Sequence, residues 1–114
     1  MPPPNRSGII DSMFRQVISI RWAQGVTAEQ KQRYREALEE LRSIPELTAL
    51  TWGDDAGIFE GNFDFVAVMD FPDFAAARRY VEHPLHQRYV HEHALPVIGE
   101  RVVVQHEWEA DRSG

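Results

Sequence analysis

The segment from Asn62 to Phe71 constrains the fold more than any other part of the sequence. Residues along it alternate strictly between two sets, which is the period-2 pattern of a β-strand. One set is apolar throughout, and the other set is apolar at its centre, through Val66 and Val68. We therefore expect both faces of the sheet to be covered at this strand, one of them by another subunit. The set that is apolar throughout consists of Phe63, Phe65, Ala67, Met69 and Phe71.

Composition limits the class of protein. The 114 residues are enough for one domain, and 43% hydrophobic with 26% charged residues is an ordinary globular composition. A net charge of −6 offers no basic surface for nucleic acid or anionic lipid, and the lack of cysteine excludes disulfides and Cys-ligated metals. No apolar run approaches the roughly 20 residues of a membrane helix, and the N-terminus lacks a signal-peptide pattern. A cytoplasmic location is therefore expected.

A first strand is predicted over residues 13–22 by the same kind of alternation. One of its faces is apolar except for Gln16. The amide of Gln16 either bonds to backbone groups near the strand end or points into a cavity. The whole face consists of Phe14, Gln16, Ile18, Ile20 and Trp22.

A helix follows this strand. Thr27 and Gln30 are spaced as a capping box, in which each side chain bonds to the backbone N–H of the other residue. The helix should end near Ile44, because the proline that follows disfavours helical geometry in the residue before it. A short strand over residues 47–52 and a glycine-rich acidic loop over residues 53–61 come next.

The second half of the chain predicts two more helices and a final strand. Asp73 is suited to cap the first of these helices. Pro84 would begin the next one, which runs to about Leu95, because proline is favoured in the first helical turn. The final strand is predicted over residues 101–108. The apolar stripe of the helix after Asp73 would be Phe74, Ala77, Tyr80 and Val81.

The resulting order, β-α-β-β-α-β, is that of the ferredoxin-like α+β fold, with a four-stranded antiparallel sheet and helices on one face. Residues 13–109 would form this domain, between a flexible N-terminal arm (1–12) and a flexible tail (110–114). The helices leave the second sheet face uncovered, and a large exposed apolar patch marks an interface. We therefore predict a symmetric homodimer in which two sheets pack through their open faces.

Tyr80, His83 and His86 form the one dense group of side chains that handle protons. On a helix that begins at Pro84, His86 would turn back towards the sheet, which makes it the candidate acid–base residue. His83 precedes a proline at a helix junction, where an imidazole commonly bonds to free backbone groups. Tyr80 lies on an apolar stripe and is either a packed aromatic residue or a catalytic hydroxyl.

The histidines do not predict a metal site. His83 and His86 are one residue short of the i, i+4 spacing of a helical zinc pair, and no glutamate stands where a base would. His91 and His93, at i, i+2, point to different faces of a helix. No metal and no other cofactor is therefore expected.

Taken together, the motifs resemble the stress-responsive dimeric α/β-barrel (Dabb) family. The resemblance extends over residues 13–109, and its most specific part is Tyr-x-x-His-Pro-x-His at residues 80–86. Family members include plant stress-induced proteins and a plant polyketide cyclase similar to olivetolic acid cyclase. The other matching motifs are Phe-Arg-x-Val (14–17), Trp-Gly-Asp-Asp (52–55), the alternating strand (61–71) and Val-Val-Val (102–104).

The resemblance implies a catalytic pair. In the cyclase a tyrosine and a histidine of this segment act together, and they correspond to Tyr80 and His86. The histidine would take a proton alpha to a carbonyl while the tyrosine stabilises the developing oxyanion, without metal or cofactor. Two further histidines of the cyclase pocket correspond to Gln16 and Phe65, so the chemistry of the pocket should differ here.

The function implied by the resemblance is that of a homodimeric stress-responsive protein that binds a small hydrophobic or polyketide-like ligand between sheet and helices. A cofactor-free cyclase-like enzyme that uses Tyr80 and His86 is the alternative. A monooxygenase or haem-degrading enzyme of the same barrel fold is a third hypothesis, which the motifs favour less. Pocket residues are expected to be Gln16, Ile18, Trp52, Phe65, Ala67 and His83.

Overall fold

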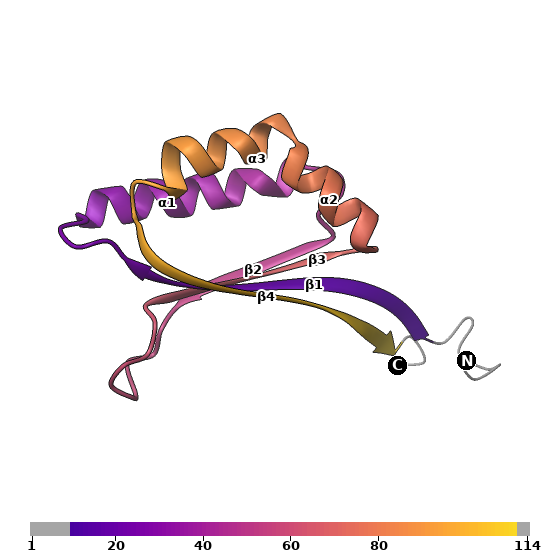
Figure 1. Ribbon diagram of the computed structural model, residues 1–114, viewed down its shortest axis with the longest axis horizontal. Helices are drawn as coiled ribbons and strands as arrows, with labels where there is room; N and C mark the ends of the chain where they lie inside the picture. Colours follow the sequence, from indigo (N-terminus) through magenta and orange to yellow (C-terminus); the bar gives the residue numbers. More distant parts are fainter. Residues whose placement is uncertain (1–9, 112–114) are drawn as a thin grey trace.

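The computed structural model describes residues 10–111 and contains one antiparallel sheet with its helices on a single face (Figure 1). This is the predicted α+β, ferredoxin-like arrangement, with the sheet order β2-β3-β1-β4. The strands are β1 (Ile10–Trp22), β2 (Ala49–Asp54), β3 (Phe65–Phe71) and β4 (Ile98–Asp111). The helical segments are α1 (Ala28–Glu40), the 3-10 turn η2 (Leu41–Ser43), α2 (Phe74–Glu82), α3 (Pro84–Arg88) and the π-helical segment η3 (Tyr89–Ala94).

The first and last strands of the chain are longer than the alternation predicted. β1 and β4 pair along their whole length, from Ile10 opposite Asp111 onwards. Residues 10–12 and 110–111 therefore belong to strands and not to the expected arm and tail. The remainder of the predicted arm and tail lies outside the described residues.

The strand predicted over residues 47–52 lies two residues later, as β2. The reason is a turn after α1, closed by a 3.1 Å hydrogen bond from the Leu47 N–H to the Ile44 carbonyl. Ile44 is extended, with φ −77° and ψ 120°, as expected before a proline. Pairing with β3 begins only at Ala49.

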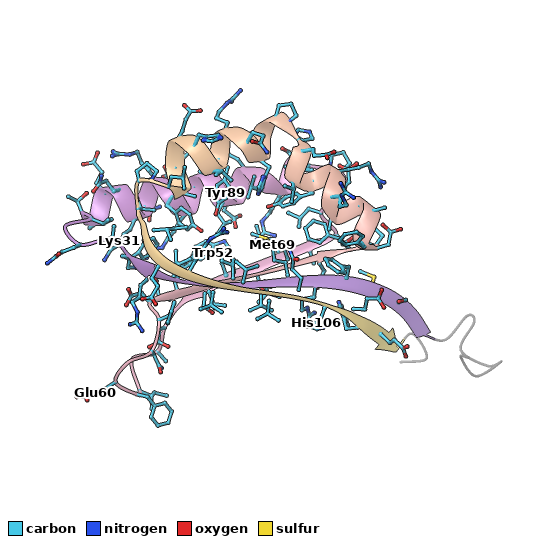
Figure 2. The ribbon with its side chains drawn as sticks, in the orientation of Figure 1. Lys31, Trp52, Glu60, Met69, Tyr89 and His106 are labelled. Carbon is cyan, nitrogen blue, oxygen red and sulfur yellow. The ribbon has the colours of Figure 1, made fainter. Side chains whose placement is uncertain are left out.

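Alternate residues of the central strands face the helices and form the core. Side chains directly opposite on antiparallel strands share a face, and Ile18 lies opposite Ala67 while Ile20 lies opposite Phe65. The apolar set of the alternating segment is buried along the whole of β3, as predicted, through Phe65, Ala67, Met69 and Phe71. Figure 2 shows Met69 and Tyr89 in the layer between sheet and helices.

The capping box at the start of α1 is formed as predicted. The Gln30 N–H donates to Thr27 Oγ1 at 3.1 Å, and the Thr27 N–H donates to Gln30 Oε1 at 2.9 Å. The helix buries Tyr34 and Leu38 against the sheet. The helix therefore covers one half of the sheet, and the cavity described in the next subsection lies over the other half.

The predicted apolar stripe of α2 was wrong at its two ends. Ala76, Ala77 and Tyr80 are buried, whereas Phe74 and Val81 are exposed. Phe74 lies in the first turn and makes an edge-on contact with Phe14, at 5.6 Å between ring centroids. A nine-residue helix makes about two and a half turns, so Phe74 in the first turn and Val81 in the last lie at the edges of the packed layer.

The sheet face opposite the helices is called the open face (Figure 1). Its centre is aliphatic, and Val102 and Val104 are 50% and 55% exposed. At one end, Arg15 donates to both carboxylate oxygens of Asp70, at 2.7 and 3.0 Å, and lies 4.2 Å from the centre of the Trp108 ring. The loop between β2 and β3 extends beyond this face (Figure 1). The remaining aliphatic residues of the face are Val17, Val66 and Val68.

Among residues 10–111, no helix is long and apolar enough to cross a membrane.

Candidate functional site

A cavity of about 570 Å³ lies between the sheet and the helices. Residues of β1 and β4 form its floor, and residues of α2, α3 and η3 form its roof. A smaller cavity of about 230 Å³ adjoins it and shares Gln16, Tyr80, Val81 and Gln105. The predicted site residues that line the larger cavity are Gln16, Ile18, Tyr80 and His86.

His83 organises the start of α3 but does not line either of these cavities. Its Nδ1 accepts a 3.0 Å hydrogen bond from the Leu85 N–H, so the imidazole caps the helix that Pro84 begins. This is the backbone role that the sequence suggested, and the predicted pocket role of His83 does not fit the structure. The consequence for the site is that α3 starts at a fixed residue, which places His86 over the cavity.

His86 is held in one protonation form by its surroundings. Its Nδ1 lies 3.1 Å from the carbonyl oxygen of Val81, and because a carbonyl only accepts, Nδ1 must carry the proton. The second ring nitrogen, Nε2, is then left with a lone pair. Burial lowers the pKa of His86 below its usual value, and the charge of His83 lowers it further, whereas the bond to Val81 opposes both. At neutral pH, His86 is therefore an uncharged imidazole with a basic Nε2.

Tyr80 packs beside His86, with ring centroids 4.7 Å apart. It is only 1% exposed, and burial raises the pKa of its hydroxyl, with a smaller contribution from Tyr34. Its hydroxyl therefore stays protonated and acts as a hydrogen-bond donor.

Two donors converge on the sulfur atom of Met69. The Tyr80 hydroxyl lies 3.7 Å from Sδ, and the Gln16 amide nitrogen lies 3.4 Å from it. Gln16 is itself held in place by Gln105, whose Nε2 donates to Gln16 Oε1 at 2.6 Å. A thioether is a weak acceptor. A carbonyl or alkoxide oxygen at this point would therefore be a better partner for both donors.

The π-helical segment η3 supplies the rest of the roof. Its wider turn is closed by a 2.9 Å hydrogen bond from the Leu95 N–H to the Val90 carbonyl, and π-turns occur frequently at functional sites. Tyr89, Val90 and Ala94 of this segment all line the cavity. The Tyr89 hydroxyl bonds to the buried Tyr34 hydroxyl at 2.7 Å, which ties η3 to α1.

Three predicted pocket residues lie elsewhere. Phe65 and Trp52 stack at 5.7 Å between ring centroids, and Phe65 also contacts Trp22 and Tyr34. This aromatic cluster fills the space under α1, so these side chains pack the core and do not line the cavity. Ala67 is fully buried in the same layer and does not line it either.

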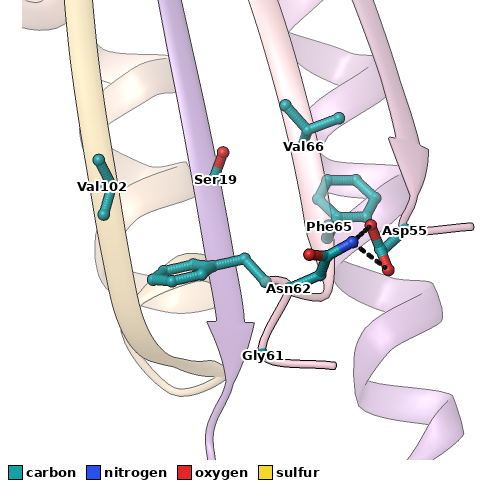
Figure 3. Close-up of a pocket in the computed structure, with 8 residues that line it drawn as sticks. Ser19, Asp55, Gly61, Asn62, Phe65, Val66 and Val102 are labelled. Atoms are coloured by element: carbon teal, nitrogen blue, oxygen red, sulfur yellow. Dashed lines mark hydrogen bonds between the residues drawn. The ribbon is translucent and has the colours of Figure 1, made fainter. Parts of the chain in front are cut away.

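Phe65 also borders a shallow pocket of about 440 Å³ at the end of the open face (Figure 3). The Asn62 side chain donates to the Asp55 carboxylate there, at 3.1 Å to Oδ1. Ser19, Val66 and Val102 also line this pocket. These residues belong to the open face, so the pocket is part of that surface and not of the cavity under the helices.

The sequence reasoning missed several lining residues. Arg101, Val103 and Gln105 of β4 lie on the floor, and Tyr89 lies in the roof. The alternation did place the three β4 residues on a common face of the strand. Knowing which face the helices cover would have assigned them to the cavity.

Among residues 10–111, no group of three or more histidine, aspartate or glutamate side chains is gathered as a metal site would require. What the site offers instead is a neutral base, two hydrogen-bond donors and an apolar enclosure.

Comparison with known proteins supports the fold and the family. A dimeric ferredoxin-like protein of unknown function from Thermobifida fusca YX is 32% identical, with 86% of this chain and 92% of that chain covered and a TM-score of 0.78. A Dabb family protein from Mesorhizobium loti is 21% identical, over 84% and 96% of the two chains, with a TM-score of 0.73. A hydroxynitrile lyase from Passiflora edulis is 19% identical, over 84% and 93%, with a TM-score of 0.77. No curated protein matches the sequence.

The family model of the stress-responsive A/B barrel domain matches residues 15–108. That span runs from Arg15, near the start of β1, to Trp108, near the end of β4. The protein therefore belongs to the stress-responsive A/B barrel domain (Dabb) family.

Proposed function

We propose that the protein binds a small, mainly apolar ligand in the cavity between sheet and helices. The observation that carries this proposal is the cavity itself, whose volume of about 570 Å³ lies within the usual range for small-molecule sites. Aliphatic and aromatic side chains form most of its lining. Three of its polar groups, from Gln16, Tyr80 and His86, are each fixed by a hydrogen bond or a ring contact, as orienting groups of a binding site are.

We also propose that the protein works as a homodimer joined through the open face. Three solved structures with this fold are described as dimeric proteins with a ferredoxin-like fold, and one of them is the 32% identical relative. The half-exposed valines of β4 are the kind of apolar surface that a second sheet would cover. A twofold pairing of this face would also bury Arg15 and Asp70, whose two hydrogen bonds already neutralise their charges.

Cofactor-free proton transfer is a second candidate function. The observation that favours it is the neutral, tautomer-fixed His86 next to two donors that converge on one point. Nε2 of His86 would take a proton alpha to a ligand carbonyl, and Tyr80 and Gln16 would donate to the oxygen on which charge develops. This is the role that the family resemblance implied for Tyr80 and His86, with Gln16 as the second donor.

The binding proposal can be tested with a neutral aromatic probe, 2-naphthamide, by isothermal titration calorimetry. Val103→Trp should abolish binding, because an indole on the cavity floor fills the space while tryptophan remains suited to a strand. Gln32→Trp, on the exposed side of α1, is the matched control and should leave binding unchanged. Equal binding by both variants would show that the probe binds elsewhere and would count against the cavity.

A further inference from the structure

We propose that the cavity takes its ligand as an anion, with a carboxylate held by Arg101, so that the ligands are small apolar carboxylic acids. This inference rests on the proposed function, because it concerns the same cavity. It adds a class of ligand and a residue that selects for it.

Arg101 lies on the cavity side of the sheet. It is paired across the strands with Ile20, which is completely buried under the helices, and opposite residues of antiparallel strands share a face. Arg101 is also one of the residues that line the cavity. Its positive charge reaches Tyr89 in the roof, where it partly opposes the rise in the pKa of that hydroxyl.

The charge of Arg101 is not balanced by the protein. Glu100 also lines the cavity, but its carboxylate is bonded to Arg21, at 3.0 Å. Among the side chains described between residues 12 and 109, no carboxylate lies within ion-pair distance of Arg101. With His86 neutral, Arg101, which is exposed to solvent, is the one cation among the residues that line the cavity. The overall charge of −6 does not reverse this, because exposed charges are screened beyond about 8 Å at physiological salt.

The floor has a cation at one end and amides at the other. Arg101, Val103 and Gln105 stand at i, i+2 and i+4 on β4, so their side chains share the cavity face. At a rise of about 3.3 Å per residue, Arg101 and Gln105 are roughly 13 Å apart along the strand. Gln105 is bonded to Gln16, which lies with Tyr80 at the Met69 sulfur. A ligand with its acid group at Arg101 would therefore lay its apolar body over Val103 and present its far end to Tyr80 and Gln16.

A carboxylate suits this position better than a phosphate. A single guanidinium presents two parallel N–H donors that match the two oxygens of a carboxylate. A phosphate dianion needs further cations, and no second unpaired arginine or lysine is found among the lining residues. The apolar side chains of Leu95 and of Val103 on the floor favour an aromatic or aliphatic body behind the acid group.

The test compares 2-naphthoate with 2-naphthamide, which have the same ring system and differ in charge. Calorimetry at low salt should show that the wild-type protein binds the acid about tenfold more tightly than the amide, as expected for one charge-assisted hydrogen-bonded pair. Arg101→Gln should remove this preference by lowering the affinity for the acid and not the affinity for the amide. Arg101→Lys should retain part of the preference. Arg88→Gln, an exposed arginine of α3 that does not line the cavity, is the control for net charge.

Each outcome bears on a separate claim. Equal affinity of the wild-type protein for the two probes would overturn the carboxylate inference while leaving the cavity as a binding site. The carboxylate inference would also be overturned if Arg88→Gln weakened binding of the acid as much as Arg101→Gln does. Failure of both the acid and the amide to bind would overturn the proposed function itself.

Discussion

Replacing Val104 by aspartate should convert the protein from a dimer to a monomer. Val104 lies near the centre of the open face, opposite Val17, and is 55% exposed in the single chain. The substitution therefore costs the isolated protomer little, because the new carboxylate faces water there. In a twofold dimer the same position is covered, and the change occurs once in each protomer.

The size of the effect follows from the exposed area. Full burial of a valine side chain contributes about 1.5–3 kcal/mol, so covering a half-exposed one contributes about 1 kcal/mol. Aspartate loses this contribution and adds the desolvation of an unpaired carboxylate, which costs several kcal/mol. Arg15 does not offset that cost, because both of its hydrogen bonds go to Asp70. A loss of about 3 kcal/mol in each protomer, or about 6 kcal/mol in the dimer, weakens association by roughly four orders of magnitude.

Light scattering during size-exclusion chromatography, from about 1 to 100 µM protein, measures this directly. Leu95→Asp is a matched control, because Leu95 is 62% exposed and lies on the helix side. We expect a dimer for the wild-type protein and for Leu95→Asp, and a folded monomer by circular dichroism for Val104→Asp. A wild-type monomer, or a Val104→Asp dimer, would refute the assignment of the open face as the interface.

Two further predictions concern the residues around the cavity. Tyr34→Phe leaves the buried Tyr89 hydroxyl without its 2.7 Å partner and should lower the free energy of unfolding by about 1–3 kcal/mol. In thermal or urea unfolding, the double variant with Tyr89→Phe should cost little more than either single change, and additive losses would contradict the pairing. If His86 is the base, wild-type protein should accelerate deuterium exchange alpha to the carbonyl of phenylacetone, and His86→Gln should not. The rate measured by NMR should rise with pH through the lowered pKa of His86 and level off above about 6.5, because only the neutral imidazole accepts a proton; a rate that still rises steeply there would exclude this base.

The strand alternation was sufficient to predict the sheet and its buried residues. A period of two assigns side chains to opposite faces without any knowledge of the neighbours, so Phe65 to Phe71 could be assigned in advance. The capping box could also be predicted, because its hydrogen bonds join two residues that are three positions apart in the sequence, Thr27 and Gln30. The ends of β1 and β4 could not, because they depend on pairing between residues about a hundred positions apart.

The site was less predictable, because membership of a sheet face does not say which element covers a residue. Phe65 and Gln16 lie on the same face of the sheet, yet Phe65 packs under α1 and Gln16 lies in the cavity. The place of Arg101 in the cavity was difficult to predict, because an arginine on a strand usually faces solvent. For His83, local reasoning about helix ends predicted its bond to a backbone N–H. The expectation that it also lines the pocket was not met, because a helix cap and a pocket residue point in different directions.

The pairing of β4 with β1 determines the residues of both the proposed ligand site and the proposed dimer interface. Val102 and Val104 point to the open face, whereas Arg101 and Val103 point to the cavity, so adjacent residues of one strand belong to different sites. A register shift of one residue would place Arg101 in the dimer interface and an interface valine on the cavity floor, and both sites would be lost together. The continuous pairing from Ile10 and Asp111 to the irregularity at Trp22 makes such a shift costly, because every ladder hydrogen bond would have to move. The long pairing of these two strands therefore fixes which residues of β4 face the cavity and which lie on the open face.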